Sequence, residues 1–316
     1  MSKNYDKFKE AIIKQDKRLF DCIPKGDLHN HALLGSNRKI FKKFYPNFTL
    51  TKFQNSNNII SLSEFIKNNI IDISKTKEGQ LKLFECTIIT AINDGIINLD
   101  LIVDYRLVIE VYNNKAEDYV KDLLSLRNRY YKKINIRYDL GISRNAYKNK
   151  HFKIIVDLIK SKAFTGIDLI GDELSMPIQK FKKIYRCAKK NNMILKAHVG
   201  EFGTSKDVYK AIKILKLDII QHGISIVDDI KVIKYAKKHN IQFNVCPISN
   251  IKLCRVENIS NHPIRKMFDE GLKITINTDD QLIFENSLFD EYILLYKNNI
   301  FTIDELNKIR LNSLSF

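Results

Sequence analysis

Cysteine is scarce in this sequence, and its few copies are not paired. The five cysteines show no C-x-x-C spacing, and their number is odd. Small secreted domains depend on even sets of closely spaced cysteines for their disulfides, so this pattern argues against a disulfide scaffold and favours a reducing, intracellular compartment. With 316 residues, the chain buries enough apolar surface to fold without such cross-links.

Long apolar runs and flexible linkers are also missing. No apolar stretch approaches the roughly 18 residues that a membrane-spanning helix needs, and the opening MSKNYDKFKE has no apolar region of a secretory leader. The five prolines and eleven glycines form no linker that would divide the chain. We therefore expect one cytoplasmic domain over residues 1–316, without a membrane partner.

Negative charge is in deficit, because 53 lysines and arginines face only 36 acidic residues and give a net charge of +17. Such an excess can attract a polyanion or a phosphorylated substrate. The lysines, however, are spread through helical patterns and do not alternate with aromatic side chains, as they do on surfaces that bind single-stranded nucleic acid. We therefore expect no nucleic-acid partner, and the sequence favours no particular oligomeric state.

What the sequence does contain is a repeating rhythm of short apolar runs and longer helical patterns. The runs begin at Ile23, Asn98, Ile134, Thr165, Ile194, Leu217, Ile241 and Leu272. Between them lie patterns such as VYKAIKILK, whose apolar residues recur three and four positions apart. Strands that alternate with helices in this way predict an α/β protein with a (β/α)8 barrel.

The connection after the first expected strand is unusually long, from about Leu33 to Ile97. Long connections inside a compact domain are uncommon and often carry function. We therefore expect a helical insertion that forms a lid or a wall of a pocket at the active end of the barrel. The alternative is an additional packing layer.

Four of the seven histidines fall at the C-terminal ends of expected strands: His29, His31, His198 and His222. Catalytic residues of such barrels come from those ends. Residues two apart on a strand point to the same side, so the first pair of rings can converge at the barrel mouth. Asp279 ends the eighth strand, which lies beside the first in a closed barrel. Three imidazoles and a carboxylate suit Zn²⁺, whereas a single histidine is more often a hydrogen-bonded core residue.

Six segments in the same order resemble the adenosine and AMP deaminase family, and adenosine deaminase most closely. They are PKGDLHNH, IDLIGDE, KAHVGE, QHGI, CPISN and HPIRKMFDEGLKITINTDD. The resemblance extends over nearly the whole chain. It implies one Zn²⁺ per chain, bound by His29, His31, His198 and Asp279.

The resemblance also implies how a purine nucleoside would be held. Glu201 would donate to N1 of the base, His222 would steady the attacking hydroxide, and Gly171 would donate its backbone N–H to N3. Asp280 would bond N7, and His31 would also contact the substrate. The reaction would convert adenosine, 2′-deoxyadenosine or a related compound to an inosine-type product and ammonia.

The expected reaction requires a distinct chemical role for the zinc ion and for each of these side chains. Zinc lowers the pKa of bound water from about 15.7 to about 7, so that hydroxide forms at neutral pH. Glu201 must carry a proton to draw electron density from the ring, and a low-dielectric pocket favours that form. Asp279 would orient the water and accept its proton. A protonated His222 would stabilise the negative oxygen.

The sequence departs from the family pattern where the sugar is usually held. Adenosine deaminases have an aspartate shortly after the second histidine, but this chain reads HALLGS there. A nucleotide deaminase is therefore an alternative, and it would need a phosphate clamp such as Arg38 or Lys39. A catalytically silent nucleoside-binding protein is a second alternative, although such a protein need not keep Glu201.

Two other zinc hydrolase types fit less well. Binuclear amidohydrolases use a bridging lysine on strand four, and TGIDLIG has none. Cytidine-type deaminases carry H-x-E and P-C-x-x-C, which are both missing. Asp104 and Arg106 are expected to form a structural ion pair. The remaining histidines, His151, His239 and His262, are expected to be surface or capping residues.

Overall fold

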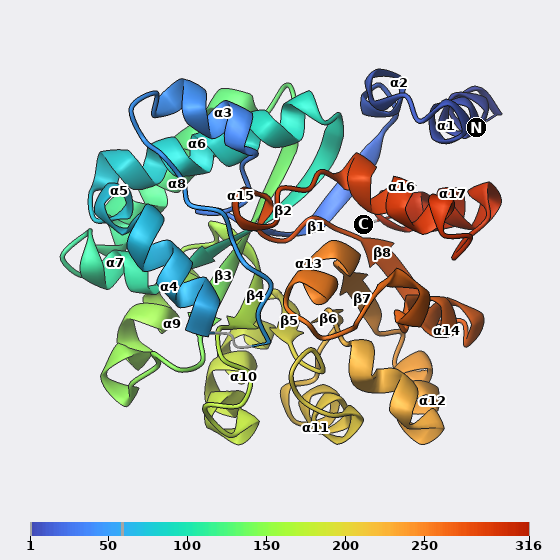
Figure 1. Cartoon of the computed structure of the whole chain (residues 1–316). Coiled ribbons are helices and arrows are strands. Elements are labelled where there is room, and N and C mark those ends of the chain that lie inside the picture. Colours follow the sequence, from blue (N-terminus) through green and yellow to red (C-terminus); the bar gives the residue numbers. More distant parts are fainter. Residues whose placement is uncertain (1, 58–59, 316) are drawn as a thin grey trace.

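Most positions of the eight strands are buried, as expected of parallel strands that are covered on both faces. The computed structural model describes residues 2–57 and 60–315, and each strand pairs in parallel with the next in sequence order (Figure 1). The strands are β1 (Lys25–His31), β2 (Ile96–Asp104), β3 (Asn135–Ser143), β4 (Phe164–Ile170), β5 (Ile194–His198), β6 (Ile219–Gln221), β7 (Gln242–Val245) and β8 (Lys273–Ile276). The predicted (β/α)8 barrel is confirmed.

Helices surround the barrel, and several of them present one apolar face to the strands. They are α1 (Ser2–Lys14), α2 (Lys17–Asp21), α3 (Arg38–Phe44), α4 (Ile60–Asn69), α5 (Ile71–Ser74), α6 (Lys77–Asn93), α7 (Arg106–Glu110), α8 (Ala116–Tyr130), α9 (Phe152–Lys160), α10 (Lys182–Lys190), α11 (Ser205–Leu215), α12 (Ile230–Lys238), α13 (Pro247–Lys252), α14 (Ile264–Asp269), α15 (Gln281–Phe284), α16 (Leu288–Lys297) and α17 (Ile303–Asn312). Four short 3-10 turns connect them, η1 (Asn149–His151), η2 (Ile178–Phe181), η3 (Ile224–Asp228) and η4 (Ile259–Asn261). None of the helices described is both long and apolar enough to cross a membrane.

The two ends of the sheet meet through side chains more than through a backbone ladder. Between β1 and the segment that follows β8, a single bridge pairs Asn30 with Asp279. The amide oxygen of Asn277 accepts from the Leu28 N–H at 2.8 Å, and the amide nitrogen of Asn244 donates to the Leu28 carbonyl at 2.9 Å. We call this junction the seam. It brings the ends of the first and last strands together at the barrel mouth.

Four helices, α3 to α6, lie between β1 and β2 and are arranged along one side of the barrel (Figure 1). Their apolar side chains form a second core with residues of α15 and the loop after α13. This core contains Leu34, Phe41, Phe53, Phe65, Ile70, Leu83, Leu253, Leu282, Ile283 and Phe284. The segment therefore packs as a layer, and α4 also contributes to the pocket described below.

A buried ion cluster lies inside the barrel below the mouth. The Lys196 ammonium on β5 bonds Asp100 of β2 at 2.5 Å and Asp139 of β3 at 2.6 Å. All three side chains are about 1% exposed. Burial raises the pKa of Asp139 to about 7 despite the nearby ammonium, and after the cost of burial the two carboxylates raise the pKa of Lys196 to about 12. Charges this deep persist only when they are paired.

Candidate active site

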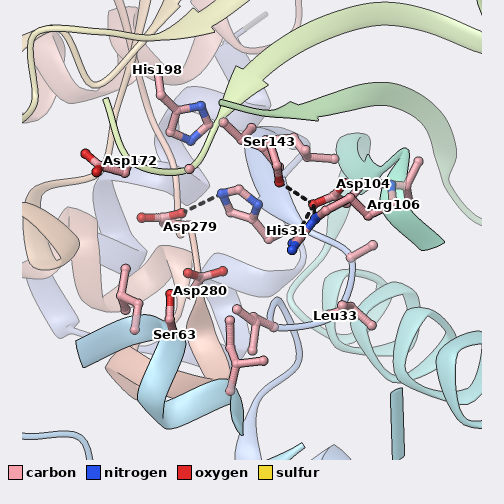
Figure 2. Close-up of a pocket in the computed structure, with 18 of the residues that line it drawn as sticks. His31, Leu33, Ser63, Asp104, Arg106, Ser143, Asp172, His198, Asp279 and Asp280 are labelled. Atoms are coloured by element: carbon pink, nitrogen blue, oxygen red, sulfur yellow. Dashed lines mark hydrogen bonds and ion pairs between the residues drawn. The ribbon is translucent and has the colours of Figure 1, made fainter. Parts of the chain in front are cut away.

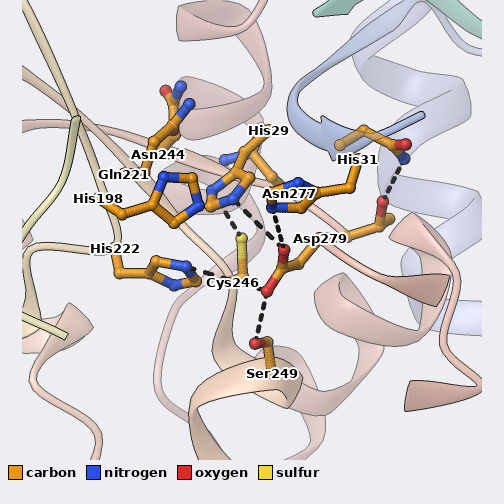
Figure 3. Close-up of polar contacts among 12 residues, drawn as sticks. His29, His31, His198, Gln221, His222, Asn244, Cys246, Ser249, Asn277 and Asp279 are labelled. Carbon is orange, nitrogen blue, oxygen red and sulfur yellow. Dashed lines mark hydrogen bonds and ion pairs between the residues drawn. The ribbon is translucent and has the colours of Figure 1, made fainter. Parts of the chain in front are cut away.

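Four imidazole rings gather at the mouth of the barrel (Figure 3). His29 and His31 come from β1, His198 ends β5, and His222 directly follows β6. The ring centroid of His29 lies 4.7 Å from that of His198 and 4.6 Å from that of His222. The structure therefore places together all four histidines that the sequence assigns to strand ends.

Asp279 completes this group from the other side of the seam. Its Oδ1 lies 3.3 Å from Nε2 of both His29 and His31, and its Oδ2 accepts from the Ser249 hydroxyl at 2.7 Å. The residue adopts a left-handed backbone with φ of 60°. Burial opposes its charge, but the imidazoles of His29, His31 and His222 together hold the pKa of Asp279 well below its usual range.

The donor atoms fit a bound cation. Ligand nitrogens of His29, His31 and His198 lie within 4.8 Å of one another. Nε2 of His29 and Nε2 of His198 are both buried, and among the described residues neither makes a well-formed hydrogen bond, although Oδ1 of Asp279 lies 3.3 Å from Nε2 of His29. Unpaired polar atoms are uncommon in protein interiors, so two such nitrogens beside a carboxylate indicate a ligand. Three imidazoles and one carboxylate with an open position are typical of a catalytic zinc site.

Two residues that the sequence did not single out hold these rings in place. Asp168 of β4 lies 3.1 Å from Nδ1 of His198 and also accepts from the Gln221 amide at 2.8 Å. Cys246 places its sulfur 3.4 Å from Nδ1 of His29. Carboxylates commonly orient metal-binding imidazoles in this way. The signal for Asp168 was present, since it is a charged residue within the apolar strand IDLI.

Glu201 lies in the loop after β5, and its pKa is raised well above its usual range by burial and then by the nearby Asp279. It is therefore a neutral acid able to donate a proton. The loop is fixed by Glu173, whose carboxylate accepts backbone N–H groups from four successive residues. These are Gly200 at 2.6 Å, Glu201 at 3.1 Å, Phe202 at 2.8 Å and Gly203 at 3.0 Å.

His222 differs from expectation in its charge. Burial, followed by the neighbouring imidazole of His29, lowers the pKa of His222 well below its usual range. The expected protonated ring is therefore disfavoured, because a cation there would lose its hydration beside other imidazoles. A neutral ring can still stabilise an oxygen as an N–H donor.

A cavity of about 300 Å³ opens in front of these groups (Figure 2). His31, Glu201, Gly171 and Asp280 line it, together with apolar residues of α4. Gly171 has a φ of 83°, which favours glycine. Asp280 has one buried oxygen without a partner, and burial raises its pKa to about 7. The cavity thus offers a carboxyl oxygen that has no hydrogen-bond partner among the described residues.

The outer part of the cavity is lined by Leu33, Asp104 and Arg106. Leu33 lines the wall, and the polar group facing it is Asp104, which accepts from the Ser143 hydroxyl at 2.6 Å (Figure 2). The predicted ion pair of Asp104 with Arg106 is present at 2.8 Å, but both residues also line the cavity. Arg38 instead bonds the carbonyl oxygens of Leu282 and Thr51.

Of the histidines expected to be surface or capping residues, His239 is exposed and His151 is partly buried. His262 is the exception. It is only 4% exposed, and its Nε2 lies 3.3 Å from the amide oxygen of Asn250. His262 is therefore not a surface residue, because the loop between α13 and α14 folds inward, but it is a capping residue, since its Nδ1 accepts from the backbone N–H of Ile264 at the start of α14.

Comparisons with known proteins agree with this geometry. The sequence model of the adenosine deaminase family matches residues 58–316, a range that contains Glu201 and Asp279 but begins after β1. A putative adenosine/adenine deaminase of Treponema pallidum is 32% identical and covers 84% of this chain and 90% of its own length.

Solved structures share the barrel. An amidohydrolase from Burkholderia ambifaria with bound Zn has a TM-score of 0.78 and 21% identity, and the match covers 93% of this chain and 85% of that one. The Arabidopsis N6-mAMP deaminase has a TM-score of 0.76 and 19% identity, with 93% of each chain covered. At these identities the likeness supports the fold.

Proposed function

The chain belongs to the adenosine deaminase family, and from that premise we propose that it is a zinc-dependent hydrolase of 6-aminopurine nucleosides such as adenosine and 2′-deoxyadenosine. The products would be an inosine-type nucleoside and ammonia. The observation that carries the proposal is the convergence of the ligand group and the neutral acid Glu201 on one cavity.

The metal ligands would be His29, His31, His198 and Asp279, whose donor atoms already face one another. When bound, Zn²⁺ supplies the Lewis acidity that makes water nucleophilic at neutral pH. Asp168 keeps Nε2 of His198 available, since it bonds the other ring nitrogen.

The chain's own residues would hold and protonate the base. Glu201 donates its proton to N1, which makes C6 more electrophilic. Asp280 is protonated for much of the neutral range because burial raises its pKa to about 7, so it can donate to N7. The Gly171 N–H faces N3. His222 and Asp279 would orient the attacking water, and Asp279 would accept its proton and pass it to the C6 amino group, which leaves as ammonia, while the proton of the added hydroxyl returns to Glu201.

The ligand assignment predicts metal loss in a single variant. Replacing His198 with alanine should lower zinc content from about one ion per chain to well under half, because one of three imidazoles is removed. Metal analysis after dialysis measures this. Alanine at His239, an exposed histidine after α12, is the matched control and should retain the metal. Full zinc content in the His198 variant would remove this residue from the ligand set.

The cavity favours a nucleoside over a nucleotide. Among the described residues that line it, Arg106 is the one lysine or arginine, and Asp104 already neutralises it. Asp172 adds a further negative charge to the lining. Like charges placed together cost several kcal/mol, and about 1.4 kcal/mol corresponds to a tenfold change.

We therefore expect kcat/KM for adenosine to exceed that for AMP by at least roughly a hundredfold. Adenine, which lacks the sugar that would reach Asp104 and Ser143, should be slower by at least about tenfold, because remote contacts contribute to turnover. An ultraviolet assay of the zinc-loaded protein with the three substrates measures both ratios. Faster AMP turnover would favour the nucleotide alternative, and no turnover of any of them would favour a silent binding protein.

A further inference from the structure

We propose that Asn250, oriented by His262, is a positioning residue that fixes the proton of His222 on Nε2 and leaves Oε2 of Glu201 to carry the acid proton. These residues form a chain of hydrogen bonds, which we call the relay. It starts at the backbone N–H of Ile264, outside the cavity, and ends at His222 and Glu201, which face the substrate. The inference rests on the proposed function for its effect on turnover, but its geometry is independent of any substrate.

The first step is set by a group that can only donate. The Ile264 backbone N–H donates to Nδ1 of His262 at 3.0 Å. A neutral imidazole that accepts at one nitrogen carries its proton on the other. The ring is neutral because burial lowers the pKa of His262 to about 3. His262 therefore presents Nε2–H to its neighbour.

The second step fixes an amide whose two ends are otherwise interchangeable. Nε2 of His262 lies 3.3 Å from Oδ1 of Asn250, so this oxygen accepts and the amide cannot rotate without placing two donors together. Asn250 is fully buried on α13. Its Nδ2 is thereby directed toward the cavity.

In the third step, the fixed orientation of the Asn250 amide determines its hydrogen bonds with His222 and Glu201. The two hydrogens of the Asn250 amide point to Nδ1 of His222 at 3.1 Å and to Oε1 of Glu201 at 3.2 Å. His222 then accepts at Nδ1 and carries its proton on Nε2. That nitrogen lies 3.6 Å from Oε2 of Glu201 and 3.9 Å from Oδ2 of Asp279.

This arrangement matters because His222 and Glu201 must both donate hydrogen bonds toward the substrate. A neutral His222 with its proton on Nδ1 would present a lone pair to the attacking oxygen and repel it. A carboxylic acid that accepts at Oε1 holds its proton on Oε2, so Glu201 can give it to a ring nitrogen. One amide thus sets the direction of two hydrogen bonds.

The test compares a donor with a side chain that cannot donate at position 262. His262→Met should lower kcat by about tenfold or more with KM changed by less than about threefold, because one orienting hydrogen bond is lost while substrate contacts remain. His262→Gln, which can donate to the same oxygen, should recover most of the rate. His239→Met is the surface control and should match the parent.

A spectroscopic measurement reads the proton directly and needs no turnover. In zinc-loaded protein with ¹⁵N-labelled histidine, the signal that disappears in His222→Gln should report a proton on Nε2. Asn250→Asp, which removes the donor without changing shape, should move that proton to Nδ1, and His262→Met should give a mixture of both forms. This result stands even if no purine is deaminated.

Three outcomes would overturn the relay. The first is a parent protein with the His222 proton on Nδ1. The second is an Asn250→Asp variant that keeps the proton on Nε2. The third is a His262→Gln variant that is folded and zinc-loaded but as slow as His262→Met, since a role in packing alone would produce that result.

Discussion

Replacing Glu201 with glutamine should lower kcat by more than roughly a hundredfold, the low end of what general acid catalysis contributes. The amide keeps the shape of the side chain and its bond with Asn250, but it has no acidic proton to give to a ring nitrogen. Burial and the neighbouring Asp279 raise the pKa of Glu201 well above its usual range, which favours the protonated form of the native group.

Steady-state kinetics on adenosine measures the loss, and metal analysis should show an unchanged zinc content because Glu201 is not among the expected ligands. Glu64→Gln, on the exposed side of α4, is the matched control and should retain full activity. Near-normal turnover in the Glu201 variant would show that another group protonates the base.

Replacing Lys196 with methionine should destabilise the fold by about 3–5 kcal/mol, the usual cost of removing one partner from a buried ion pair. Asp100 retains Arg137, which donates to it at 2.6 Å. Asp139 would lose the ammonium that bonds it at 2.6 Å, inside the barrel and away from water.

Urea unfolding followed by circular dichroism measures this change, and the double variant Lys196→Met with Asp139→Asn should recover part of the loss because it removes the stranded charge. Lys190→Met, at the exposed end of α10, should shift stability by less than about 0.5 kcal/mol. A similarly small shift at Lys196 would mean that the cluster is hydrated or carries a different charge.

The sequence predicted the barrel because its strands are buried on both faces and read as short apolar runs. It also predicted which histidines share the mouth, since β1 places His29 and His31 two positions apart and the topology of a barrel brings the end of β5 opposite them. These inferences need only periodicity and chain order.

Contacts between distant segments could not be read in the same way. His262 was expected to be a surface or capping residue, and it does cap α14, but nothing in its local pattern shows that the loop after α13 turns inward to Asn250. The charge of His222 depends on how deeply four imidazoles are packed, which is a property of the assembled site. The nucleotide alternative would need a phosphate clamp such as Arg38 or Lys39, but Arg38 bonds the backbone oxygens of Leu282 and Thr51.

The seam has a consequence for how the site fails. His29 and His31 lie on the β1 side of the seam, and Asp279 lies on the β8 side. The two sides are joined mainly by amide and hydroxyl side chains. In energetic terms the barrel behaves as an open eight-stranded sheet whose two edge strands, β1 and β8, are held together by these few contacts. A fluctuation that separates these two edges would move the metal ligands apart while the other strands kept their backbone hydrogen bonds. The enzyme would therefore lose activity before it unfolded.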